Sequence, residues 1–159
     1  MGLFENKIKQ FPKIFDWVER QDVSRLSNFL LDYNRCNRLF VASGGSFSAA
    51  VYAEQLSADK GIMSHALTPL LYAGSGFAHV AARTLLISAS GYNNDILRAY
   101  DNGCRAEEQE VGAVVLSSKG RLQTLMQEDD VNSLFGFDIP TGRDGFLSST
   151  TVVAFYTLL

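Results

Sequence analysis

Short apolar runs alternate with longer helical segments along this 159-residue chain, and this alternation is the feature that most constrains its fold. The clearest run, residues 84–88, has three consecutive aliphatic residues at its centre. A strand that is apolar throughout is typical of parallel sheets whose crossover helices cover both faces. Five strands are predicted, at residues 38–42, 64–68, 84–88, 112–117 and 133–139. Helices are predicted at residues 46–60, 95–106, 122–128 and 145–159, and the segment after Pro69 is predicted to be a loop.

The segment 4–34 instead places apolar residues at steps of three and four, which is typical of amphipathic helices. The sequence therefore predicts an N-terminal helical arm, residues 1–36, followed by an α/β domain, residues 37–159. The domain is expected to be a flavodoxin-like, three-layer α/β/α fold with about five parallel strands. Residues 151–159 are strongly apolar and end without the usual capping signals, so we expect the chain to be the front part of a longer protein.

Composition excludes several classes of partner. Hydrophobic residues make up 47% of the chain, which supports a proper core, and the net charge is −3 with scattered basic residues, which argues against a nucleic acid partner. No apolar run approaches the roughly 18 residues of a membrane helix, so no membrane partner is expected. Two cysteines are too few for a disulfide framework or a zinc site, which favours a reducing, cytoplasmic location and no metal.

The first candidate ligand loop is Ser-Gly-Gly-Ser-Phe-Ser, residues 43–48, directly after the first strand. Glycines allow a close backbone approach, and the free N–H groups at the start of the following helix favour an anion such as phosphate. Taken alone, the loop could equally be a tight strand–helix turn with a serine cap. It lacks the Gly-Lys-Ser/Thr ending of a P-loop and the G-x-G-x-x-G spacing of a dinucleotide-binding loop, so no nucleotide cofactor is expected.

A second loop of the same design follows the third strand, at residues 88–95. Ser88 and Ser90 offer hydroxyls, Gly91 allows a turn, and Asn93 offers an amide or a helix N-cap. Ligands of parallel α/β sheets bind beyond the carboxyl ends of the strands, so two such loops together indicate a phosphate site more strongly than one.

With these motifs the chain resembles the sugar isomerase (SIS) domain family, the phosphosugar-binding module of glucosamine-6-phosphate synthase and of related isomerases and regulators. That family carries Cys-Gly-Thr-Ser where residues 43–46 read Ser-Gly-Gly-Ser. It carries Ser-Gln-Ser-Gly-Glu-Thr-x-Asp-Thr where residues 88–96 read Ser-Ala-Ser-Gly-Tyr-Asn-Asn-Asp-Ile. It opens a late helix with Glu-Ile-Gly-Val-Ala-Ser-Thr-Lys, where residues 143–150 read Arg-Asp-Gly-Phe-Leu-Ser-Ser-Thr.

The resemblance implies a set of ligand-binding residues and places the greatest difference at the catalytic position. The implied substrate-binding set is Gly44, Gly45, Ser46, Ser88, Ser90, Gly91, Asn93 and Arg143. The family's isomerases keep a proton-shuttling Glu where this chain has Arg143, and a guanidinium cannot act as that base. Asp144 is the candidate replacement, although a carboxylate that favours a helix N-terminus explains it as well. Arg143 could likewise be a solvated surface residue.

Three functions follow from these features. The chain could be a non-catalytic phosphosugar sensor or regulatory module, which the missing Glu favours. It could instead be a phosphosugar isomerase, or an aminotransferase-type isomerase, that moves a proton between C1 and C2. A purely assembling role with an empty site is the third. Because family members associate, a homodimer or a tandem second domain is the expected partner.

Overall fold

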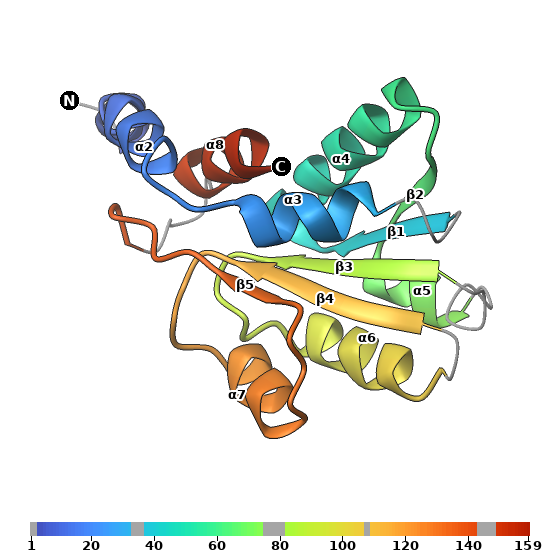
Figure 1. Ribbon diagram of the computed structural model, residues 1–159. Coiled ribbons are helices and arrows are strands. Elements are labelled where there is room, and N and C mark those ends of the chain that lie inside the picture. The colour runs from blue at the N-terminus through green and yellow to red at the C-terminus, as the bar shows by residue number, and fades with distance from the viewer. Residues whose placement is uncertain (1–2, 33–36, 75–81, 107–108, 143–148) are drawn as a thin grey trace.

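In the computed structural model, which describes residues 3–32, 37–74, 82–106, 109–142 and 149–159, five parallel strands form one sheet (Figure 1). The strands are β1 (Asn37–Ala42), β2 (Met63–Leu67), β3 (Ala82–Ser88), β4 (Gln109–Val115) and β5 (Leu134–Gly136). Their spatial order is β2-β1-β3-β4-β5, and every pairing is parallel. The predicted flavodoxin-like sheet is therefore confirmed. The chain moves from β1 outward to β2 and then back to β3, so the switch in strand order lies between β1 and β3.

Helices cover both faces of the sheet (Figure 1). On one face lie α1 (Leu3–Ile8), α2 (Phe11–Val18), α3 (Ser24–Leu31), α4 (Phe47–Asp59) and α8 (Ser149–Leu158). On the other lie α5 (Pro69–Gly74), α6 (Asn94–Cys104) and α7 (Arg121–Glu128). A short 3₁₀ turn, η1 (Gly44–Ser46), joins β1 to α4.

Neighbouring residues along each central strand contribute to different cores. In β1, Phe40 packs with the α4 and α8 layer, whereas Leu39 and Val41 pack with the α6 and α7 layer. Since side chains alternate across a strand, a continuously apolar strand supplies both cores at once. This explains why the apolar runs in the sequence identified the strands so well.

The prediction of a loop directly after Pro69 is wrong for its first part, because Pro69–Gly74 forms helix α5. The rest of the predicted loop, 75–81, lies outside the described residues. Proline is well suited to the first turn of a helix, where its missing N–H leaves no bond unmade. The Thr68 hydroxyl accepts a hydrogen bond from the Leu71 N–H at 3.2 Å, which caps the helix start. Within the described parts of the chain, no helix is long and apolar enough to cross a bilayer.

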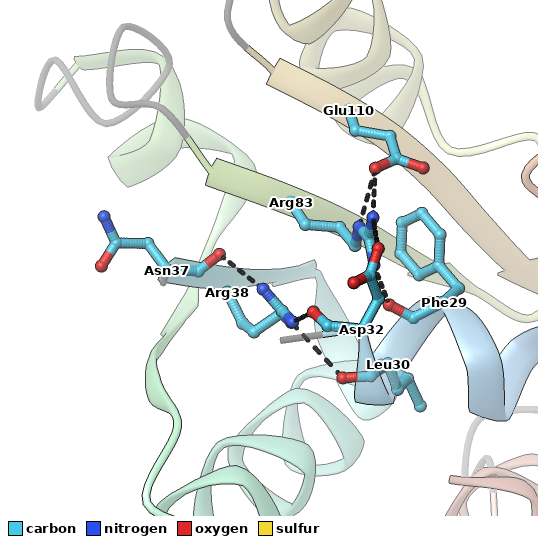
Figure 2. A network of polar contacts seen from close by, with 7 residues as sticks. All are labelled: Phe29, Leu30, Asp32, Asn37, Arg38, Arg83 and Glu110. Atoms are coloured by element: carbon cyan, nitrogen blue, oxygen red, sulfur yellow. Dashed lines mark hydrogen bonds and ion pairs between the residues drawn. The ribbon is translucent and has the colours of Figure 1, made fainter. Parts of the chain in front are cut away.

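Two buried arginines fasten α3 to the amino ends of β1 and β3 (Figure 2). Arg38 donates to the main-chain carbonyls of Leu30 and Asp32, at the last turn of α3. A cation stabilises that end of a helix, because the exposed carbonyls give it partial negative charge.

Arg83 makes the ionic part of the same network (Figure 2). Its guanidinium lies 2.8 Å from an Asp32 carboxylate oxygen and 2.6 Å from one of Glu110, and it donates to the Phe29 carbonyl at 2.8 Å. It also lies over the Phe29 ring, 4.9 Å from the centroid. Burial opposes the charged form, but the hydrogen bonds to Asp32 and Glu110 outweigh burial and raise the pKa of Arg83.

Replacing Arg83 with Met should lower the free energy of unfolding by about 2 kcal/mol, measured by urea denaturation. The loss comes from leaving Asp32 and Glu110 without their cation, and it is moderated because both carboxylates are about one-third exposed. Arg105→Met is the matched control, since Arg105 pairs with Asp101 on the surface and is 76% exposed. That control should change stability by less than about 0.5 kcal/mol. Equal losses in the two variants would contradict this account.

Candidate functional site

The loops that follow β1 and β3 meet at the carboxyl edge of the sheet. The two strands are direct neighbours, with Ala42 in register with Ile87, so their next residues leave the sheet side by side. A pocket of about 160 Å³ lies between the loops. It is lined by Ser43, Gly45, Ser46, Ile87, Ser88, Ala89, Ser90, Asn93 and Thr151. This is the position at which open parallel sheets bind ligands.

Three helices begin around this pocket. The turn η1 leads from the pocket-lining Ser46 into α4, Asn93 immediately precedes α6, and Thr151 belongs to the first turn of α8. Several of the first N–H groups of α6 are already paired with Asn93, but the partial positive charge of a helix N-terminus remains. The three helix starts therefore favour an anion at the pocket.

The two serines of the β3–α6 loop use their oxygens as acceptors within the loop. Ser88 Oγ accepts from the Gly91 N–H at 3.1 Å, and Ser90 Oγ accepts from the Tyr92 N–H at 3.3 Å. A hydroxyl that accepts a backbone hydrogen bond still has its own proton to donate. Ser88 is buried and Ser90 half-buried, and both line the pocket. Their available hydrogen-bonding capacity therefore favours an acceptor such as an anion.

Asn93 follows the same rule. Its Oδ1 atom accepts from the N–H groups of Asp95 and Ile96, at 2.9 and 3.2 Å, and so caps α6. The rest of the side-chain amide is an NH₂ group, which can only donate. Asn93 can therefore fill both roles that the sequence predicts for it, the helix N-cap through its oxygen and the ligand donor through its NH₂ group.

Most of the predicted site residues come together. Gly45, Ser46, Ser88, Ser90 and Asn93 line the pocket. Gly44 and Gly91 do not line it, but they have positive φ angles of 57° and 69° that let the two loops turn. Arg143 and Asp144 lie outside the described residues.

Two hydroxyl residues of the lining, Ser43 and Thr151, are not among the residues that the sequence predicts. Ser43 opens the first motif, which contains the predicted Ser46. Thr151 is buried and reaches the pocket from α8, just beyond the last motif aligned with the family. The sequence does show a hydroxyl residue in the first turn of the last helix. It does not show that this residue contacts the first two loops, because that contact joins distant parts of the chain.

The described lining contains no titratable side chain. Across the described part of the chain, no cluster of His, Cys, Asp or Glu could hold a metal ion. The lining residues can therefore bind and orient a ligand, and none of them can serve as a general acid or base.

A larger pocket of about 430 Å³ lies elsewhere, between α3, α4 and Leu159. Its lining is dominated by Leu30, Leu31, Phe40, Leu56 and Ile62, so it has few polar groups to orient a small molecule. The smaller pocket at the strand ends is the better candidate because donors converge on it.

Comparison with known proteins finds likeness in structure and not in sequence. No protein-family model matches the chain, and no curated protein sequence matches it. Tagatose-6-phosphate ketose/aldose isomerase from Escherichia coli superposes with a TM-score of 0.74 at 17% identity, over 96% of this chain and 45% of that one. Glucosamine-6-phosphate deaminase from Thermotoga maritima superposes at 0.63 and 15% identity, over 95% and 46%. The Vibrio vulnificus NanR protein, solved with ManNAc-6P, superposes at 0.67 and 12% identity, over 99% and 59%.

These neighbours show the fold of the chain. They are a sugar-phosphate isomerase, a glucosamine-6-phosphate deaminase and a protein solved with ManNAc-6P, which agrees with the resemblance to the SIS family seen in the motifs. The chain spans less than half the length of the first two proteins and about three-fifths of the third. The fold implied by the resemblance is thus confirmed.

Gly91→Ala should lower the free energy of unfolding by about 3 kcal/mol, from a positive φ and from overpacking. An added Cβ would overlap the end of the Gln123 side chain, which is buried and hydrogen-bonded and so has little room to move. Gly61→Ala is the matched control, with a φ of 73° and nothing within 4 Å of the added Cβ, and should cost only about 1 kcal/mol. Thermal and urea unfolding measure both, and an equal cost would show that the overlap is relieved.

Proposed function

We propose that this protein binds a phosphorylated sugar, an aldose, ketose or amino-sugar phosphate, and holds its phosphate group in the 160 Å³ pocket. The observation that carries the proposal is that the side chains at the site are left with hydrogen-bond donors. The oxygens of Ser88, Ser90 and Asn93 each accept from backbone N–H groups, and each side chain keeps a donor. A phosphate has only acceptor oxygens when ionised, so donors and helix N-termini suit it.

The size of the pocket supports phosphate as the group that is held. Pockets that enclose a drug-sized molecule usually exceed about 300 Å³. A pocket of about 160 Å³ suits one small group, with the rest of the sugar lying above the strand ends. The likeness to proteins that act on or bind sugar phosphates supports the same class of ligand.

We further propose that binding occurs without turnover, as in a sensor or regulatory module. Two observations support this choice. The described pocket lining has no acid or base, and Arg143 stands where the resembling isomerases keep Glu. An arginine at that place is suited to a second phosphate or carboxylate oxygen and not to proton transfer.

A second copy of the domain, in the same chain or across a dimer, is the proposed partner, and the cytoplasm is the proposed location. An exposed aromatic pair on α4 and α8 gives this proposal a surface: the rings of Tyr52 and Tyr156 lie 4.9 Å apart and are both more than one-third exposed. Aromatic residues are enriched at protein interfaces.

Asn93→Asp is the sharpest test of binding. Aspartate caps a helix as well as asparagine does, so the melting temperature should stay close to that of the wild type. The donor NH₂ becomes a negative charge facing the ligand, so the affinity for sugar phosphates should fall at least tenfold in calorimetry. Asn28→Asp, the same change at an exposed position of α3, is the control and should bind as the wild type does. Unchanged binding by Asn93→Asp would place the phosphate elsewhere.

A thermal-shift assay tests the class of ligand. We expect a shift of the melting temperature with at least one sugar phosphate and none with the unphosphorylated sugars, because a ligand of the folded state raises its stability. The absence of any shift at millimolar ligand would overturn the binding proposal.

Turnover is tested separately by incubating the protein with fructose 6-phosphate, glucosamine 6-phosphate and tagatose 6-phosphate in deuterated water. We expect no deuterium at C2 by NMR. Deuterium uptake at C2 would instead identify an isomerase.

A further inference from the structure

We infer that Gln123 on α7 is a positioning residue for the phosphate pocket. Its buried amide lies tightly between Gly91 and Gly120, and this contact holds the β3–α6 loop in the conformation that presents hydrogen-bond donors to the pocket. This inference rests on the proposed function for its consequence, namely ligand affinity. Gln123 does not line the phosphate pocket, although it lines a neighbouring pocket with Tyr92 and Lys119. The inferred effect on the phosphate pocket therefore acts through the loop.

Gln123 is buried, and its side chain is fixed by one hydrogen bond. Its side chain is 4% exposed, and its Nε2 donates to the Ser117 carbonyl, just beyond the end of β4, at 2.5 Å. Its Oε1 is buried and has no hydrogen-bond partner among the described residues. A buried amide oxygen without a partner is costly, so its retention calls for a role in the surrounding structure.

Two glycines make room for that oxygen. A Cβ added at either Gly91 or Gly120 would overlap Gln123 Oε1, so the oxygen lies against both glycines where any side chain would begin. A Cβ at Gly120 would also overlap the Ser90 carbonyl, which shows how closely the β4–α7 loop approaches the β3–α6 loop. The Leu122 N–H donates to the Gly91 carbonyl at 2.9 Å and ties the start of α7 to the same point.

Gly91 is the residue through which this contact reaches the ligand. Its N–H is the donor that occupies the Ser88 oxygen, and that bond leaves the Ser88 proton for the pocket. If Gly91 shifts, Ser88 is free to turn and present an acceptor lone pair to an anion. Gln123 therefore sets the hydrogen-bonding polarity of Ser88 from outside the pocket.

The chemistry of the amide makes the inference testable with two variants. Methionine at 123 fills similar space but donates nothing to Ser117. Gln123→Glu keeps the shape of the side chain, but a glutamate can donate to the Ser117 carbonyl only when it is protonated. The ionised form faces that carbonyl with negative charge. Burial disfavours the ionised form, so this carboxyl should titrate above its usual range and regain the donor as the pH falls.

The experiment measures binding of inorganic phosphate and of fructose 6-phosphate by calorimetry between pH 5 and pH 8, with amide hydrogen exchange at Gly91 by NMR. Gln123→Met should lower affinity about tenfold at every pH and speed exchange at Gly91. Gln123→Glu should lose as much at pH 8 and recover toward the wild type at pH 5, each value being compared with the wild type at the same pH. Gln127→Met, an exposed glutamine one turn further along α7, is the matched control and should leave both readouts unchanged.

The outcomes separate this inference from the proposed function. If the wild type binds neither probe, the proposed function fails, and exchange at Gly91 still decides whether Gln123 holds the loop. If the wild type binds and Gln123→Met binds equally well, the positioning role is overturned. A loss in Gln123→Glu that does not depend on pH would show that the donor to Ser117 does not set the affinity, and it would overturn the inference as well. Should Gln123→Glu fail to fold, the methionine variant and the exchange rates remain decisive.

Discussion

The parallel pairing of β1 with β3 is the constraint on which the candidate site depends. It joins two strands that are separated in sequence by α4, β2 and α5, and it brings their carboxyl ends into register at Ala42 and Ile87. Two serine and glycine loops that are more than 40 residues apart thereby become the two walls of one pocket. The donors of both loops and the starts of α4 and α6 follow from this adjacency, whereas Thr151 reaches the pocket separately from α8.

The proposed preference of the site for anions needs no charged side chain in its described lining. The oxygens of Ser88, Ser90 and Asn93 accept hydrogen bonds from backbone N–H groups of the loop, and each side chain keeps a donor for a ligand. Neutral donors of this kind need no compensating countercharge when the site is empty. The cost is that the loop must be held precisely, and this is where Gly91, Gly120 and Gln123 matter.

Stability and binding are concentrated at opposite ends of the sheet. Near the amino ends of the strands, Arg38 and Arg83 fasten α3 through carbonyls and carboxylates (Figure 2). At the carboxyl ends, small residues dominate and the contacts are hydrogen bonds within loops. The two buried arginines are paired at the far end of the sheet, so the described pocket lining consists of small neutral residues.

The sequence by itself determined the central strands β1, β3 and β4, because an apolar run buried on both faces leaves a signal that does not depend on its neighbours in space. It also located the two serine and glycine loops, although either loop alone could have been a capped turn. It misjudged the segment after Pro69, where the Thr68 cap and the proline together begin α5. Only the tertiary structure decided the strand order, the arrival of Thr151 from α8 and the tight contact of Gln123 with two glycines. Each of these is a contact between residues far apart in the chain, and no local pattern specifies which distant residue will fill a given space.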